Sequence, residues 1–286
     1  MNTTAEPGHG LARVLPPLVF GLLAAYLIVT SIRSFNDTTT LWVTSSVVTF
    51  AVCWANATHL LGWRPALTFV LLAISIGWFA EQMGDTRGWF FGDYTYTDAL
   101  GPRLGQVPIV VPLIWFVLTY IGYVIANLIV WHAPVDRSDH IGELLLLSAV
   151  AAMIVTAYDL GMDPYMVFVL KAWIMEKTDG AWFTETVQGF VGWAVIAFII
   201  ITTFRLIYRN KQPKPFGPFT RRHALVPVLV YFGMMMGQVF TGHPVEVRTI
   251  AVFAMGIPIL CALAGWRYWR RLAADGSLTG GANHVR

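Results

Sequence analysis

Four carboxylic acids of this sequence lie inside or beside long apolar segments: Glu81, Asp93, Asp159 and Asp163. An ionised group at the centre of a bilayer costs on the order of 3 kcal/mol on insertion scales, so each acid needs a partner or has a task. Arginines nearby in the chain are available as partners, which leaves a structural role as the alternative for each acid. A carboxylic acid in an apolar site can stay protonated near neutral pH and can then serve as an acid.

The segment "DLGMDP" places two of these acids four residues apart. On a helix, Asp159 and Asp163 would share one face. Pro164 disfavours helical geometry at Asp163 and is expected to end the fifth helix. Residues 165–176 are apolar but too short to span a bilayer, so we predict a re-entrant or interfacial helix there.

Aromatic residues gather in the same stretches as the acids. Trp and Tyr commonly line the interface of membrane proteins with lipid, and this is the alternative interpretation. We accept it for Trp42, Trp63, Trp131, Trp266 and Trp269. The remaining cluster favours a pocket shared with the acids, and its members are Trp89, Phe90, Phe91, Tyr94, Tyr96, Trp115, Trp173 and Trp182.

The elements that must position these side chains are transmembrane helices. Of the 286 residues, 56% are hydrophobic and only 12% are charged, whereas soluble domains carry about 25% charged residues. Backbone groups in lipid must be satisfied internally, which favours an all-α polytopic membrane bundle. Eight apolar runs are long enough to span: Leu15–Ile32, Leu41–Leu61, Ala66–Gln82, Val107–Trp131, Ile141–Leu160, Gly189–Tyr208, Ala224–Thr241 and Thr249–Trp269.

Lysine and arginine in the short loops predict the orientation. The bias places both termini in the cytoplasm, in a single membrane domain over 1–286 with a short tail over 1–14 and a flexible tail over 272–286. Most acids then fall on the outer side, in the connections 81–106 and 159–188. Helices three to six would therefore frame one outward-facing polar vestibule.

Several classes of function are excluded by what the sequence lacks. No two of its seven histidines lie within four residues of each other, which argues against a di-iron site, and we expect no metal. No glycine-rich nucleotide motif follows a strand, no lysine lies in a spanning segment to hold retinal, and no soluble basic face suits nucleic acid. We expect no cofactor and no nucleic-acid partner.

The first connection resembles a known family. "GWFFGDYTYTDALGPRLGQVPIVVPLIWF" is similar to the G-x-Y-x-Y…LG…VP…P…W block of the CruF-type carotenoid biosynthesis family of integral-membrane carotenoid hydratases. Glu81 and Gly84 fit the acid and glycine that precede this block. "DLGMDP", Trp173, Gly180, Trp182 and "FVGW", which ends at Trp193, match a second block. The segment "TETVQGFVGW" departs from the family pattern, with no proline and with Gly189 in place of asparagine.

The resemblance implies an enzyme that adds water to the terminal isoprenoid double bond of an acyclic or C50 carotenoid, which leaves a tertiary alcohol. It also implies a carotenoid and membrane lipid as partners, and a bacterial or archaeal cytoplasmic membrane as the location. Contact with other membrane enzymes of the pathway is left open. The reaction needs an acid to protonate an alkene, a group that orients water, and aromatic faces that stabilise a carbocation.

We therefore expect Asp159 or Glu81 to donate the proton and Asp163 or Asp93 to orient the water. The expected substrate-binding residues are Trp89, Tyr94, Tyr96, Trp115, Trp173, Trp182 and Trp193. Two alternatives start from the same resemblance: a cyclase or isomerase of the carotenoid end group, and a membrane protein that binds a carotenoid without catalysis.

Overall fold

The structure is a computed structural model that describes residues 8–36, 38–136, 138–176, 180–210 and 218–274. Within these ranges, eight helices are long and apolar enough to cross a membrane. Their positions agree with the eight predicted spans, so the prediction of an all-α membrane bundle is confirmed.

The helices and strands follow each other along the chain as follows: α1 (Gly8–Arg33), α2 (Thr39–Leu61), α3 (Trp63–Arg87), β1 (Tyr94–Tyr96), η1 (Asp98–Leu100), β2 (Arg103–Leu104), β3 (Val107–Pro108), α4 (Val110–Val130), α5 (Ile141–Tyr165), η2 (Met166–Leu170), β4 (Trp173–Met175), α6 (Val187–Tyr208), α7 (Pro218–His223), α8 (Val226–Thr241) and α9 (Glu246–Ala274). Helix α1 thus begins within the predicted N-terminal tail, and α9 extends past residue 272. Residues 1–7 and 275–286 lie outside the described residues.

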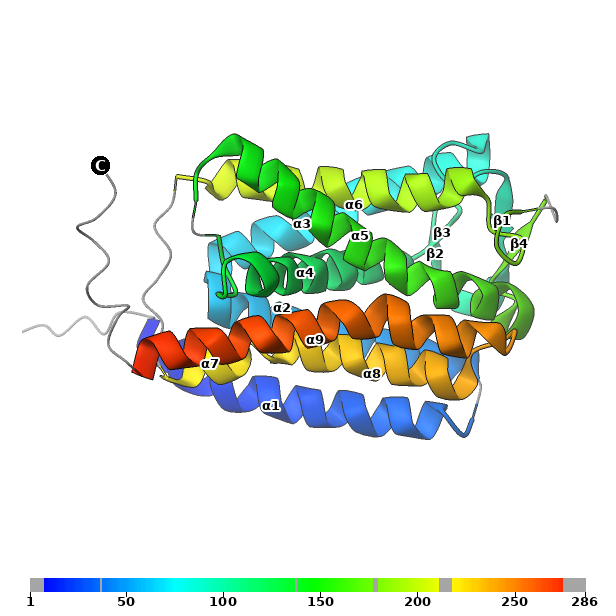
Figure 1. The fold of residues 1–286 in the computed structure, drawn as a ribbon. Coiled ribbons are helices and arrows are strands. Elements are labelled where there is room, and N and C mark those ends of the chain that lie inside the picture. Colours follow the sequence, from blue (N-terminus) through cyan, green and yellow to red (C-terminus); the bar gives the residue numbers. More distant parts are fainter. Residues whose placement is uncertain (1–7, 37, 137, 177–179, 211–217, 275–286) are drawn as a thin grey trace, which may run out of the picture.

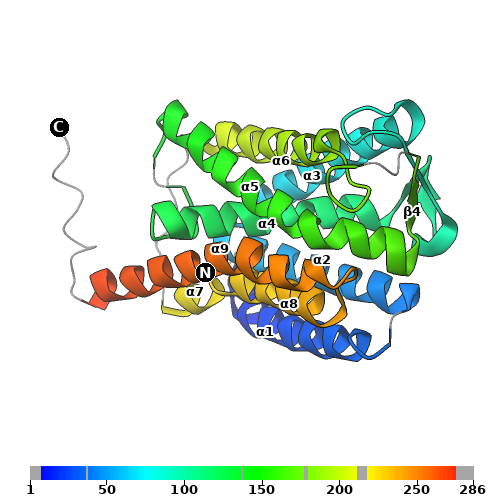
Figure 2. The same cartoon turned by 45° about the vertical axis from the view of Figure 1, so that its right-hand side comes forward.

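Helix α4 is the centre of the bundle. In its most apolar stretch of 18 residues, 78% of the residues are buried, more than in any other described span. Helix α4 packs against α2, α3, α5 and α9. Helix α1 begins and α9 ends at one end of the bundle, and the short strands lie at the opposite end (Figures 1 and 2). The two ends of the helical region therefore lie on the same side, as an even number of spans requires. Which side faces the cytoplasm stays a prediction.

The predicted separate helix near 165–176 is wrong. Helix α5 continues through Pro164 to Tyr165, a π-helical turn follows over Met166–Leu170, and the chain then becomes strand β4. Proline has no N–H for the carbonyl four residues earlier, which is Leu160. The indole Nε1 of Trp182 donates to the Leu160 oxygen at 2.8 Å instead, so the helix does not have to end at the proline.

Replacing Trp182 with phenylalanine should therefore destabilise this end of α5. The variant keeps most of the ring but leaves the Leu160 carbonyl without its donor, which costs about 1–3 kcal/mol for a buried polar group. We expect a lower apparent melting temperature in detergent. The matched control is Trp89→Phe, because the Trp89 side chain is 51% exposed. Equal melting temperatures for the Trp182→Phe variant and the parent would contradict this role.

A pair of strands joins the two polar connections. Strand β1 lies antiparallel to β4, with Tyr94 opposite Met175 and Tyr96 opposite Trp173. The ladder is extended by the bonds from the Thr97 amide to the Ala172 oxygen and from the Glu176 amide to the Asp93 oxygen. Chain segments about 80 residues apart are thereby bonded together at one end of the bundle (Figure 1).

Candidate active site

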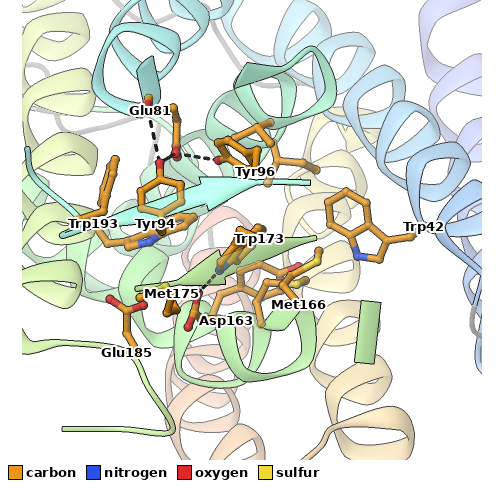
Figure 3. A pocket seen from close by; sticks show the side chains of 15 residues that line it. Trp42, Glu81, Tyr94, Tyr96, Asp163, Met166, Trp173, Met175, Glu185 and Trp193 are labelled. Carbon is orange, nitrogen blue, oxygen red and sulfur yellow. Dashed lines mark hydrogen bonds between the residues drawn. The ribbon is translucent and has the colours of Figure 1, made fainter. Parts of the chain in front are cut away.

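A cavity lies beneath the β1–β4 pair, at the strand end of the bundle. Its volume is about 60 Å³, which is room for several water-sized groups. Acidic, aromatic and methionine side chains dominate its wall (Figure 3). It is lined by Trp42, Glu81, Phe91, Tyr94, Tyr96, Val111, Ile114, Tyr158, Met162, Asp163, Met166, Trp173, Met175, Glu185 and Trp193.

The strand pair supplies the roof of this cavity. Successive side chains of a strand point to opposite faces, so the residues before and after Thr95 share one face of β1. Tyr94 and Tyr96 are buried on that face, together with the buried Met175 and the partly buried Trp173 of β4, and all four line the cavity. Ile174, between the last two, is 61% exposed on the other face. The alternation in "DYTYT" is the sequence signal of this strand.

Glu81, on α3, accepts three hydrogen bonds at one edge of the cavity. The phenols of Tyr94 and Tyr96 lie 2.5 and 2.8 Å from its Oε2, and the Trp115 Nε1 lies 2.8 Å from its Oε1 (Figure 3 shows the tyrosine contacts). Burial raises the pKa of both phenols well above 10, so they stay protonated and can donate. An indole N–H can only donate. Three donors around one carboxyl group suit a carboxylate anion.

Trp115 connects this anion to the aromatic wall. It stacks on Trp193 with ring centroids 4.5 Å apart, and only Trp193 of the two lines the cavity. A Cβ atom at Gly77 would lie 2.6 Å from the Trp115 ring, so α3 carries glycine at the point where this indole passes. The indole is thereby held in the position from which its N–H reaches Glu81.

The second acidic group of the cavity is a pair, Asp163 on α5 and Glu185 just before α6. Trp173 donates its Nε1–H to Asp163 Oδ1 at 2.9 Å. The carboxyl group of Glu185 lies close to that of Asp163, whose charge helps to raise the pKa of Glu185. Two buried carboxylates side by side are unfavourable, so this pair favours holding at least one proton. Figure 3 shows the pair and Glu81 on different sides of the roof residues Tyr94 and Trp173.

A tight turn places Glu185 in the cavity. Glu185 and Trp182 exchange both backbone hydrogen bonds, and the two residues between them have positive φ angles of 45° and 80°. Thr186 then caps α6 by accepting from the Gly189 amide at 3.0 Å. A Cβ atom at position 189 would lie 1.4 Å from Glu185 Oε1. Gly189, where the sequence departs from the family pattern, therefore makes room for the Glu185 carboxyl group.

The pKa of Glu185 is raised, so its carboxyl group stays protonated to a much higher pH than an ordinary carboxylic acid does. Burial, and next the charges of Asp163 and Asp159, raise the pKa of Glu185 from 4.5 to about 11. A group whose pKa rises on folding adds stability below its unfolded-state pKa, and that stability is lost as the pH rises toward the folded-state value. Burial of Glu185 therefore weakens the fold progressively above about pH 4.5.

Glu185→Gln should remove this pH-dependent loss, because a neutral amide needs no proton to be buried. We expect the variant to melt at a higher temperature than the parent at about pH 8, with the difference disappearing near pH 4.5. Thermal unfolding in detergent at the two pH values is the measurement. The matched control is Glu143→Gln, an exposed acid at the start of α5. A pH-independent shift would contradict the protonation argument.

The other predicted acids lie outside the cavity wall. Asp159 is fully buried one helical turn before Asp163, and among the described residues neither of its oxygens has a hydrogen-bond partner. Asp93 is exposed, with its carboxylate against the backbone of Gly88. Of the four acids proposed from the sequence, the structure thus brings Glu81 and Asp163 together at the cavity.

The aromatic predictions divide in the same way. Tyr94, Tyr96, Trp173 and Trp193 line the cavity, and Trp115 contacts Glu81 behind the wall. Trp89 is half exposed and Trp182 bonds the α5 backbone, so neither lines the cavity.

Glu185 and Trp42 are among the wall residues that sequence reasoning missed. Glu185 lies in the polar connection before the sixth predicted span and is only 4% exposed. The one signal in the sequence was the glycine four residues later, which leaves space for a side chain. The interpretation of Trp42 as an interface residue is wrong, because it is 4% exposed and lines the cavity. The sequence around Trp42, "TTTLWVTSS", contains no signal that distinguishes a tryptophan at the lipid interface from one in a cavity wall.

Among the described residues, no group of three or more His, Cys, Asp or Glu side chains could hold a metal ion. The groups at the cavity that can take part in chemistry include the Asp163–Glu185 pair, the hydrogen-bonded carboxyl group of Glu81 and the aromatic faces.

Comparison with known proteins assigns the chain to a family. A family model described as carotenoid biosynthesis protein matches residues 39–263. The chain belongs to the carotenoid biosynthesis protein family. That match contains every residue that lines the cavity. A bisanhydrobacterioruberin hydratase from Haloarcula japonica is similar to this family member, with 29% identity over 143 residues.

This similarity covers 49% of the chain and 45% of the Haloarcula protein, so the chain spans less than half the length of that relative. No solved structure matches the chain significantly. A role in carotenoid biosynthesis, in a protein whose eight long apolar helices suit a membrane, follows from the family and the fold together.

Proposed function

We propose that this protein is a carotenoid hydratase, which adds water to the terminal isoprenoid double bond of an acyclic or C50 carotenoid and yields a tertiary alcohol. The observation that carries the proposal is a cavity lined by a close carboxyl pair, a separate hydrogen-bonded carboxyl group and aromatic side chains. The name of the Haloarcula relative supports the same reaction.

The Asp163–Glu185 pair is the acid in this proposal. Both residues are buried and line the cavity, and burial and the neighbouring acids raise the pKa of Glu185 to about 11, so that it holds a proton. Loss of that proton leaves two carboxylates side by side, which is unfavourable unless a positive charge forms next to them. A carbocation on the substrate is such a charge. Among the acids proposed from the sequence as proton donors, Asp159 does not line the cavity, and Glu81 has the surroundings of an anion.

Glu81 takes the second role. Its carboxylate, held by three donors, stabilises the tertiary cation by its charge and accepts a proton from the attacking water. The faces of Trp173, Trp193 and Tyr94 add cation–π attraction, worth about 2 kcal/mol when desolvated.

The steps balance in atoms and charge. The acid pair gives a proton to the less substituted alkene carbon, and the π electrons form the new C–H bond, which leaves a tertiary cation. A water oxygen bonds to that cation while its proton passes to Glu81. Water then carries this proton from Glu81 to the acid pair, and the net change is one water added.

Expression in a lycopene-producing bacterium tests the proposal, with pigments separated and weighed by mass spectrometry. Hydration adds the mass of one water molecule for each end that reacts. A cyclase or isomerase would give products of unchanged mass, and a non-catalytic binder would co-purify with unmodified pigment. Either result would replace the hydratase by the corresponding alternative. The Asp98→Asn variant is the matched control, because Asp98 is an exposed acid of the same connection.

A further inference from the structure

A second cavity adjoins the candidate active site. It lies between α1, α2, α5 and α8, has a volume of about 30 Å³, and shares Trp42, Ile114, Tyr158 and Met162 with the first cavity as a common wall. The two cavities differ in chemistry. Polar side chains that line the second cavity but not the first include Thr30, Arg33, Ser45, Ser46, Thr49 and Gln238.

These polar groups leave hydrogen-bonding capacity unused. The hydroxyl groups of Ser45, Ser46 and Thr49 donate to carbonyl oxygens of their own helix at 2.6–2.9 Å, which leaves lone pairs free to accept. Within the described residues, Arg33 donates one of its five side-chain N–H groups to Ser45 Oγ, at 3.1 Å. The lining can therefore accept and donate further hydrogen bonds to a small polar molecule.

Three buried polar atoms of this lining have no hydrogen-bond partner within the described residues. They are the Oγ1 of Thr30, which is 8% exposed, the Nε1 of Trp42, which is 4% exposed, and the Oε1 of Gln238, which is 5% exposed. Buried polar groups in proteins are nearly always hydrogen-bonded, to protein or to ordered water. The indole can donate, the amide oxygen can accept and the hydroxyl can do either, so water can satisfy all three.

We propose that the second cavity binds water and delivers it through the shared wall at Trp42 and Tyr158 to the cavity of Glu81 and Asp163. This role rests on the proposed hydration. A volume of about 30 Å³ holds roughly two water molecules, because each needs about 10–15 Å³ of this space. The aromatic and methionine wall of the first cavity keeps bulk water out, and the hydroxyl-lined chamber supplies it in small number.

Gly237 offers a way to fill this chamber. It lines the second cavity from α8, and the nearest atom to a Cβ at this position is the flexible guanidinium end of Arg33, at 3.1 Å. Gly237→Leu should occupy the space of the water. The matched control is Gly21→Leu on α1, where no atom lies within 4 Å of the added Cβ. Thr49→Val, which keeps the size and removes the hydroxyl, serves if the larger change prevents folding.

Radiolytic hydroxyl-radical labelling of the purified full-length protein in detergent reports the water directly, since radicals form from bound water and oxidise adjacent side chains. We expect Trp42 and Met162 to be labelled although both are buried, and the buried Met255, which lines neither cavity, to stay unlabelled. Gly237→Leu should lower the labelling of Trp42 and Met162 several-fold and reduce hydrated carotenoid about ten-fold in the producing host. Gly21→Leu should change neither.

Unlabelled Trp42 and Met162 in the parent would mean a dry chamber and would overturn the proposal. Loss of labelling in Gly237→Leu with unchanged hydration would also overturn it, because the water would then reach the reaction by another way. Failure of the proposed function has a different signature: no hydrated product in the parent or in Gly21→Leu, with labelling intact. That result would remove the hydration and with it the delivery role.

Discussion

Asp163→Asn should stop hydration while leaving the fold and carotenoid binding in place. The amide oxygen can still accept from Trp173 Nε1, so this hydrogen bond is retained, and an amide next to Glu185 adds no charge. The variant lacks one of the two carboxyl groups of the pair at the cavity, and Glu185 loses the acidic neighbour with which it shares a proton. A positioned proton transfer is worth about 10²–10⁴ in rate, and we expect a loss of that size in the rate of product formation in isolated membranes.

Two companion variants sharpen this experiment. Asp98→Asn changes an exposed acid that pairs with Arg103 and should hydrate at the parental rate. Asp159→Asn tests the donor expected from the sequence, since Asp159 is buried one turn away but does not line the cavity. If Asp159→Asn abolishes hydration and Asp163→Asn does not, the assignment of the acid to the Asp163–Glu185 pair is wrong.

Glu81→Gln should separate protonation of the alkene from addition of water. The amide oxygen can accept from Trp115, and the amide N–H₂ can donate to the phenol oxygens of Tyr94 and Tyr96, so the side chain keeps its position. The negative charge opposite the cation is lost, and with it the base that takes the proton from water. Loss of one such electrostatic contact costs about 10²–10³ in rate.

Deuterium oxide distinguishes the two roles. With Glu81→Gln, the acid pair can still protonate the alkene and take a proton back, so recovered carotenoid should contain deuterium without added water. With Asp163→Asn, the recovered carotenoid should contain neither deuterium nor added water. Gln82→Glu, which adds a charge next to Glu81 where the side chain bonds the Gln106 amide outside the cavity, is the control for charge alone. Recovered pigment free of deuterium in Glu81→Gln would make Glu81 the proton donor.

The helices of this protein could be predicted from its sequence because lipid imposes a simple requirement. A span needs about 20 apolar residues and satisfies its own backbone, so each run of the sequence identifies a helix without reference to the rest of the chain. The eight predicted spans agree with the structure for this reason. The prediction that α5 ends at Pro164 was wrong because the continuation of the helix depends on a hydrogen-bond donor, Trp182, from a separate segment of the chain.

The site was predictable in part for a related reason. Glu81 and Asp163 could be found because a carboxyl group beside an apolar run is costly and therefore informative. Glu185 could not, because in the sequence it lies in a polar turn, and only the packing of that turn against α5 buries it. Asp93, in an equally polar segment, remains exposed beside the end of α3.

The backbone ladder between β1 and β4 also determines what can be exchanged between related proteins. Tyr94 and Tyr96 face inward only while Trp173 and Met175 hold their register, and Glu81 loses two donors if those tyrosines move. A chimera that imports one of the two connections would combine strands from different parents and misalign the roof. Substrate preference should therefore transfer only when both connections are moved as one unit.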